Sequence, residues 1–295
     1  MRNYYRFLLL CLLLSGWTMA DGFREQFRKA FGAGKAPAVE KVLANWERAT
    51  PSDPDLYVAQ FNWLLKKSER LELQPSATRQ ASKIAIEDEQ GKTVGSIGSG
   101  HDPELVAQAA QALMKGLSLA PDRLDMHFGL AKLYEMTSQP KRQLETLRNA
   151  LAHRPTDGKP WRWRDGGALP AAEALFVPGS LEEYAGFYWR QEGSEPLEHA
   201  RNIAELIEQY YPQSSLGFFN TGVYYSIKGE FAKAYAKLQQ ADALAPNDAS
   251  TVGNLTKLAI ELKRKDDATR YLAKLRQLPD TKEAVADFTE QLKGL

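Results

Sequence analysis

The chain has 295 residues, of which 43% are hydrophobic and 25% charged, so it can form one elongated domain or two compact ones. The formal net charge is +1 and no long run of Lys or Arg occurs, which gives no electrostatic reason to expect nucleic acid as a partner. The single cysteine, Cys11, lies in an N-terminal apolar segment. The rest of the chain therefore offers no thiol for a disulfide, a nucleophile or a metal site.

The N-terminus has the pattern of a secretory signal. Arg2 and Arg6 form a positive region, an unbroken apolar run covers Phe7 to Leu14, and Thr18 and Ala20 occupy the −3 and −1 places of a cleavage site. This pattern predicts a signal peptide over residues 1–20. The mature chain, residues 21–295, is then expected in the periplasm or outside the cell, with no integral membrane segment after cleavage.

Two alternatives to this cleavage stay open. An uncleaved anchor is the first, although the apolar run is short for a membrane span of about 20 residues. Lipidation of Cys11 is the second, although Leu10 stands where a lipidation motif prefers Gly or Ala.

The mature chain begins with a series of expected helix pairs. Residues 20–51 form a degenerate first unit, and a second unit opens with a helix from Asp55 through Leu65. Its second helix is expected only at 103–119, because an insertion over residues 74–102 separates the two. In that insertion alternating apolar residues flank a Gly-containing loop, which predicts a β-hairpin; the apolar positions are Ile84, Ile86, Val94 and Ile97 around Asp88 to Gly91. A disordered loop is the alternative.

A further unit ends at Pro155 and is followed by a second insertion, residues 156–179, rich in Gly and Pro. It contains Trp161, Arg162, Trp163 and Arg164. Trp and Arg are enriched in interface hot spots, so this segment is a candidate partner contact. If it is extended, both Trp side chains lie on one side and both Arg on the other. The alternative is that the two Trp anchor the loop on the helices.

Two helices are expected at 181–191 and 196–210, two more units at 215–246 and 248–279, and a final helix at about 282–292. Helix-ending prolines recur 34 residues apart, at Pro121 and Pro155 and again at Pro212 and Pro246. The unit before Pro246 resembles a tetratricopeptide repeat, a 34-residue helix–turn–helix. The positions that match its signature are Phe218, Gly222, Tyr225, Gly229, Ala234, Leu238, Ala241 and Pro246.

This resemblance implies an all-α superhelix of about five repeats, with a capping helix and a small β-hairpin insertion. Gly222 is then a small contact that lets two helices lie close, and Gly229 ends the first of them. The unit at 248–279 lacks the glycine turn. In the unit before Pro155, Gln143 replaces the usual small residue.

The family also implies a groove that receives extended peptides. Asn220 and Asn254 stand 34 residues apart in the same place of consecutive repeats. They resemble the asparagine ladder of O-linked N-acetylglucosamine transferase, in which side-chain amides bond a peptide backbone. Phe219, Val223 and Lys257 are expected to face the same groove. Ordinary surface asparagines are the alternative.

The sequence gives no positive sign of catalysis. Gly91-Lys92-Thr93 lacks the earlier glycine of a phosphate-binding loop, and the Gly95, Gly98, Gly100 series has Pro103 where a dinucleotide motif needs glycine. None of the four histidines is paired at metal spacing. We therefore expect no enzyme activity, no cofactor and no metal.

The sequence therefore predicts an exported scaffold that binds a protein or peptide partner in the cell envelope. Two other functions remain open, because one fold hosts many functions. One is a periplasmic immunity or inhibitor protein that neutralises a secreted toxin. The other is an accessory factor for assembly of envelope polymers.

Overall fold

The computed structural model describes residues 19–75, 84–87, 89–91, 93–155 and 159–295. The chain divides into two compact units between Leu133 and Tyr134, inside one helix. The first unit contains α1 (Met19–Gly32), α2 (Ala36–Ala49), α3 (Pro54–Ser68), β1 (Glu69–Pro75), β2 (Ile84–Glu87), β3 (Thr93–His101), α4 (Pro103–Leu119) and most of α5 (Leu124–Met136). The second contains the end of α5, α6 (Pro140–Ala152), α7 (Glu173–Trp189), α8 (Ser194–Tyr210), α9 (Ser215–Ile227), α10 (Phe231–Leu244), α11 (Ala249–Glu261), α12 (Lys265–Leu275) and α13 (Lys282–Lys293).

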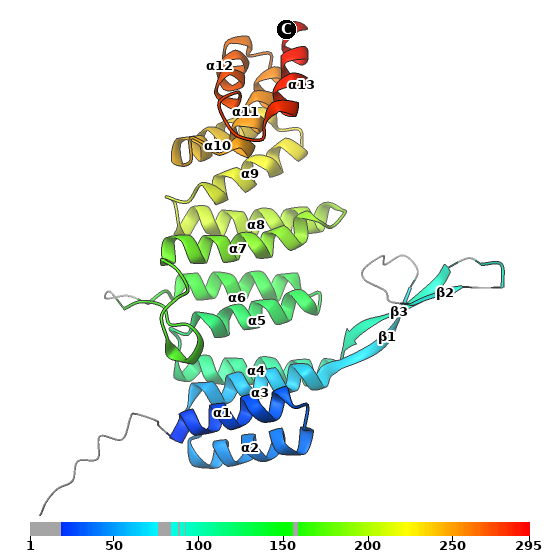
Figure 1. Ribbon diagram of the computed structural model, residues 1–295, viewed down its shortest axis with the longest axis vertical. Helices are drawn as coiled ribbons and strands as arrows, with labels where there is room; N and C mark the ends of the chain where they lie inside the picture. The colour runs from blue at the N-terminus through cyan, green and yellow to red at the C-terminus, as the bar shows by residue number, and fades with distance from the viewer. Residues whose placement is uncertain (1–18, 76–83, 88, 92, 156–158) are drawn as a thin grey trace, which may run out of the picture. The chain divides into compact units, whose positions relative to one another are not determined.

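Consecutive helices pack as pairs within each unit (Figure 1). In the first unit α1 packs on α2 and α3 on α4; in the second α7 packs on α8, α9 on α10 and α11 on α12. The last helix, α13, contacts α11 and α12, as expected of a capping helix. The predicted all-α architecture of helix–turn–helix units is confirmed. The predicted signal peptide lies outside the described residues, except that Met19 and Ala20 open α1.

The turns inside the pairs use a left-handed backbone whether or not a glycine is present. Gly229 follows α9 with a φ of 74°. Lys263 follows α11 with a φ of 56°, and Ser138 follows α5 with a φ of 54°. Glycine adopts this conformation without a steric penalty, whereas Lys and Ser do not. The missing glycine in the repeat at 248–279 therefore raises the steric energy of the turn but does not change its left-handed conformation.

The close approach of α9 and α10 depends on Gly222. A Cβ built there would lie 2.7 Å from Leu238 Cγ and 3.4 Å from the carbonyl oxygen of Ala234, both on α10. Leu238 and Ala234 are fully buried in a core with Tyr235, which α11 and α12 also line. The role that the sequence assigns to Gly222 is confirmed.

A three-stranded antiparallel sheet interrupts the α3–α4 pair (Figure 1). Its order is β1-β3-β2, and the β2–β3 pairing confirms the predicted hairpin. The strand β1, which was not predicted, begins at Glu69, before the predicted insertion start at residue 74. The sheet is tied to α3 where the Asp102 N–H donates to the Ser68 carbonyl oxygen at 2.7 Å. Asp102 then caps α4 by accepting from the N–H groups of Glu104 and Leu105.

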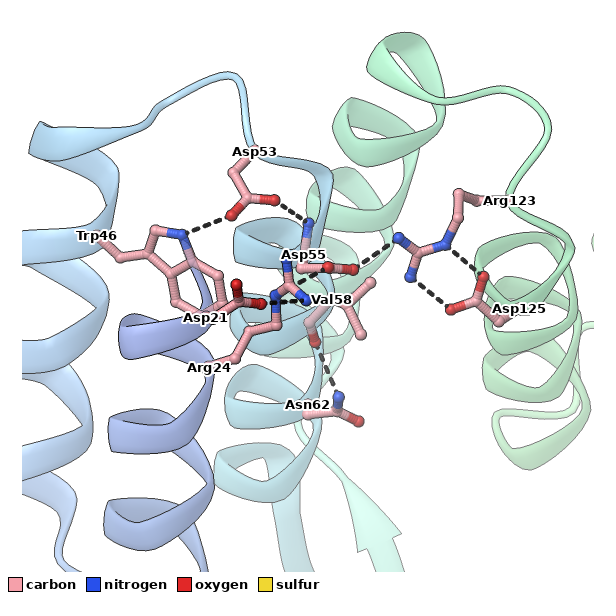
Figure 2. Close-up of polar contacts among 9 residues, drawn as sticks. All are labelled: Asp21, Arg24, Trp46, Asp53, Asp55, Val58, Asn62, Arg123 and Asp125. Carbon is pink, nitrogen blue, oxygen red and sulfur yellow. Dashed lines mark hydrogen bonds and ion pairs between the residues drawn. The ribbon is translucent and has the colours of Figure 1, made fainter. Parts of the chain in front are cut away.

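Buried ion pairs join three helices of the first unit (Figure 2). Arg123, only 2% exposed, donates to Asp55 Oδ1 at 2.6 Å and holds both carboxylate oxygens of Asp125 at 2.8 Å. Arg24 of α1 lies 3.1 Å from Asp55 Oδ2, and it also pairs with Asp21 at 3.2 Å. Burial raises the pKa of Asp55, against the opposing effect of Arg123. The carboxylate at the start of α3 is therefore desolvated and depends on its two arginines.

Candidate partner-binding surface

The second insertion is anchored on the helices by its tryptophans. Trp161 is 1% exposed, and Trp163 is half-buried with its ring centroid 4.9 Å from that of Phe176 in an edge-on contact. Arg162 and Arg164 are exposed. The side chains thus alternate as predicted. Because Trp161 is buried, its side chain is not accessible to a partner. The hot-spot hypothesis is therefore wrong for Trp161, which anchors the loop on the helices.

Trp161 meets a polar cluster at the start of α7 and the end of α8. Its indole interacts with Tyr211, and the hydroxyl of Tyr211 donates to Glu173 Oε1 at 3.0 Å. Arg154 Nε lies 2.7 Å from the same oxygen, and its guanidinium stands over the Tyr211 ring at 5.9 Å from the centroid. These contacts fix the position of Tyr211 and of the first turn of α7.

A cleft opens beside this cluster, with a volume of about 640 Å³. Its walls come from the start of α7, the end of α8, the segment that joins α8 to α9, the start of α9 and the end of α10, with Arg154 beyond the end of α6. Leu175 is 73% exposed and Leu244 is 36% exposed, which leaves apolar surface accessible to a ligand. The complete lining is Arg154, Ala174, Leu175, Pro178, Tyr210, Tyr211, Pro212, Gln213, Ser214, Ser215, Leu216 and Leu244.

The predicted asparagine ladder is only partly accessible. Asn220 is 5% exposed; its Nδ2 donates to the Leu216 carbonyl oxygen at 2.9 Å and its side chain hydrogen-bonds Glu182 of α7. The expectation that Asn220 is exposed is wrong, because α7 packs against α9 at this point. Burial raises the pKa of Glu182, and the hydrogen bond with Asn220 opposes that rise.

The other predicted groove residues lie in mixed environments. Asn254 is half-buried, and its Nδ2 donates to the Ser250 carbonyl oxygen at 2.8 Å. Lys257, one turn further along α11, is exposed. Phe219 packs against the core of α10 to α12, and Val223 is half-buried on α9. Of the five, Lys257 and Asn254 are thus the residues best placed to contact a partner, and that role stays a prediction.

A buried polar network explains why Gln143 replaces the small residue of the repeat signature. The Oε1 of Gln143 accepts from the Tyr188 hydroxyl at 2.8 Å and from His199 Nε2–H at 3.0 Å. The Nε2 of Gln143 faces Glu135 Oε2 at 3.4 Å. Gln143 is fully buried and the other three residues are at most 6% exposed. A small residue there would leave Tyr188 and His199 without this acceptor.

The network predicts a pH-dependent stability. Burial lowers the pKa of His199 to about 4, below the value of about 6.5 expected in the unfolded chain. Between these two pKa values His199 is protonated in the unfolded state but not in the folded state. Its contribution to the free energy of unfolding is therefore present above about pH 6.5 and is lost as the pH falls toward 4. We expect a loss of about 2 kcal/mol between about pH 7 and 5.

Urea unfolding of the protein at a series of pH values measures this loss. His199→Gln keeps a donor toward Gln143 but cannot titrate, so its loss over the same range should be smaller by that amount. His153→Gln is the matched control, since His153 is exposed at the end of α6. An unchanged pH dependence in His199→Gln would show that the imidazole does not carry the effect.

Neither a metal centre nor a membrane span is evident in the part of the chain that the structure describes. No group of three or more His, Cys, Asp or Glu side chains there is placed to hold a metal ion. Within the same residues, no helix combines the length and the apolar character needed to cross a membrane. Lys92 of the glycine-lysine-threonine motif and Cys11 fall outside the described residues.

No family model matches the sequence, and no curated protein matches it. Solved structures are similar to it. The structure from a study of Pseudomonas aeruginosa pilF is 22% identical, covering 64% of this chain and 83% of its own, with a TM-score of 0.37. TTC0263, a thermophilic TPR protein of Thermus thermophilus, is 21% identical over 64% and 92%, with a TM-score of 0.36. YrrB, described as a TPR protein with an unusual peptide-binding site, is 12% identical over 63% and 84%, with a TM-score of 0.39. The helix pairs described above follow the helix–turn–helix pattern that the sequence predicts.

Proposed function

We propose that the chain is an exported scaffold that binds an extended segment of a protein partner, and that the cleft between α7 and α9 receives an apolar side chain of that segment. The observation that carries this proposal is the cleft itself, with its exposed Leu175 and Leu244. Large apolar side chains left open around a concave site are typical of surfaces that bind a partner.

The chemistry of the lining favours a peptide segment. The apolar lining includes Leu216, Pro178 and Pro212, while Arg154, Gln213 and Ser215 supply polar groups. A volume of about 640 Å³ holds one or two large side chains and some adjoining backbone. The surrounding polar groups can then hydrogen-bond the backbone that enters and leaves.

The exposed part of the predicted groove offers a second contact for the same partner. Asn254 and Lys257 lie on α11, in the same unit as the cleft. Lys257 favours an acidic residue in the partner, and Asn254 favours a backbone amide. Because Asn220 is buried, Asn220→Ala should lower the stability of the fold and is not a test of partner binding.

A display experiment tests the binding proposal. A random dodecapeptide phage library is selected on the purified protein, and the affinities of the enriched peptides are measured by isothermal titration. We expect peptides with a large apolar residue, and at least about a tenfold loss of affinity in Leu175→Asp. Asp in the first turn of α7 suits a helix N-terminus, so the fold should persist.

Ile227→Asp is the matched control. Ile227 is 59% exposed at the end of α9 and is not part of the cleft, so this variant should bind the peptides like the parent protein. Equal binding by the parent and Leu175→Asp, or the absence of any enriched peptide, would remove the support for the cleft.

The exported location is a separate part of the proposal. It is supported by the basic residues, the apolar run and the small residues before position 21. Intact-mass measurement of the protein recovered from the cells that make it should give a chain beginning at Asp21. A mass that includes residues 7–14, or an added lipid on Cys11, would contradict cleavage after Ala20.

A further inference from the structure

The strand β1 is an edge of its sheet. In the order β1-β3-β2, β1 pairs with β3 on one side, and no other described strand pairs with it. An edge strand presents backbone N–H and C=O groups that can pair with another chain. Leu71, the third residue of β1, is 76% exposed. This edge therefore has both the backbone groups and the apolar side chain to extend the sheet.

The charges of β1 complement those of a second copy. In an antiparallel pair with a two-fold axis perpendicular to the sheet, one residue of the strand faces its own copy. If that residue is Leu71, Arg70 of each chain lies opposite Glu72 of the other. If it is Arg70 or Glu72, two like charges face each other instead. Opposite charges across a pair of strands stabilise it and like charges destabilise it.

The side chains that would pair lie on the same face of the sheet. Arg70 is opposite Gly100 and Glu72 is opposite Gly98 on β3. The space above Gly100 is taken by Glu72, whose Cδ would lie 2.1 Å from a Cβ built at that glycine. Arg70 Nε donates to Glu72 Oε1 at 2.7 Å, and both side chains keep more than a third of their surface exposed. Arg70 also pairs with Asp102 at 3.3 Å. Because Arg70 and Glu72 are both partly exposed, each can exchange the Arg70–Glu72 contact for the oppositely charged side chain of a second copy.

We infer that two copies of this chain associate through β1, in an antiparallel register centred on Leu71, to form one continuous six-stranded sheet. Two Arg70–Glu72 pairs lie on one face of the new junction, and the two Leu71 side chains meet on the other. This interface lies in the first unit and involves none of the cleft residues of the second.

Sedimentation equilibrium over a wide range of concentrations tests the inference. The parent protein should show a monomer–dimer equilibrium. Arg70→Glu places two pairs of carboxylates in opposition, and Glu72→Arg places two pairs of guanidinium groups in opposition. Each single variant should raise the dimer dissociation constant by at least about tenfold. Circular dichroism should show unchanged folding, because both side chains are solvent-accessible.

Charge exchange distinguishes this register from a general effect of charge. The double variant Arg70→Glu/Glu72→Arg should dimerise like the parent, and an equimolar mixture of the two single variants should form heterodimers. A parent protein that stays monomeric at every concentration overturns the inference. Pairing of its β1 edge with a strand of another protein would not rescue it. Single variants that dimerise as well as the parent, or that fail to associate with each other, overturn the register.

Discussion

Arg123→Met is expected to destabilise the protein by about 3–5 kcal/mol, the usual result of removing one member of a buried ion pair. Arg123 contacts Asp55 and Asp125 at 2.6–2.8 Å and is 2% exposed (Figure 2). Without its guanidinium, Asp125 loses both of its charge-assisted bonds and Asp55 keeps only Arg24. Burial then acts on two carboxylates that have lost a shared cation.

Chemical denaturation measures this loss, and Arg270→Met is the matched control. Arg270 pairs with Asp267 at 2.7 Å, but its side chain is 62% exposed. An exposed pair of this kind contributes about 0–1 kcal/mol. Equal losses of unfolding free energy in the two variants would show that burial does not increase the contribution of the Arg123 ion pairs to stability.

Gly222→Leu is expected to destabilise the second unit by about 3 kcal/mol or more, because overpacking displaces a helix here as well as a side chain. The first added carbon already lies 2.7 Å from Leu238 Cγ and 2.9 Å from Leu238 Cδ2. Leu238 is fully buried and cannot move aside without disturbing Tyr235 and the α11–α12 pair. Neighbouring repeats share such interfaces, so the damage should extend to both of them.

Gly253→Leu separates this effect from helix propensity. Gly253 lies inside α11, and a Cβ built there has no neighbour within 4 Å. Leu is a better helix former than Gly by up to about 1 kcal/mol, so this variant should be neutral or more stable. Equal denaturation midpoints for Gly222→Leu and the parent would contradict the α9–α10 interface.

The repeat architecture could be predicted from the sequence because its contacts are local. Gly222, Ala234 and Leu238 belong to one 34-residue repeat, so their spacing in the sequence is enough to predict that the two helices pair. The turn at Lys263 shows the limit of this reasoning. The sequence lacks a glycine there, yet the packing of α11 on α12 imposes the same left-handed turn as at Gly229.

The candidate site was harder to predict because it depends on contacts between successive repeats. Asn220 and Asn254 are equivalent in sequence, but Asn220 is buried and interacts with Glu182 of α7, whereas Asn254 is half-buried. The cleft combines residues from Arg154 to Leu244, and no spacing rule links them. For β1 a signal existed: Leu71 and Leu73 alternate with Arg70, Glu72 and Gln74, which is a period-two pattern.

Site-specific photocrosslinking in the cell tests the central claim, partner binding in the cleft, most directly. A photoreactive phenylalanine analogue replaces Leu175 in one variant and Ile227 in the other; both positions are exposed, but only the first lines the cleft. Irradiation should give a discrete protein adduct from position 175 that is absent from position 227, with the crosslink mapping to an apolar segment of the partner. No adduct at position 175, or the same adducts at both positions, would contradict binding in the cleft.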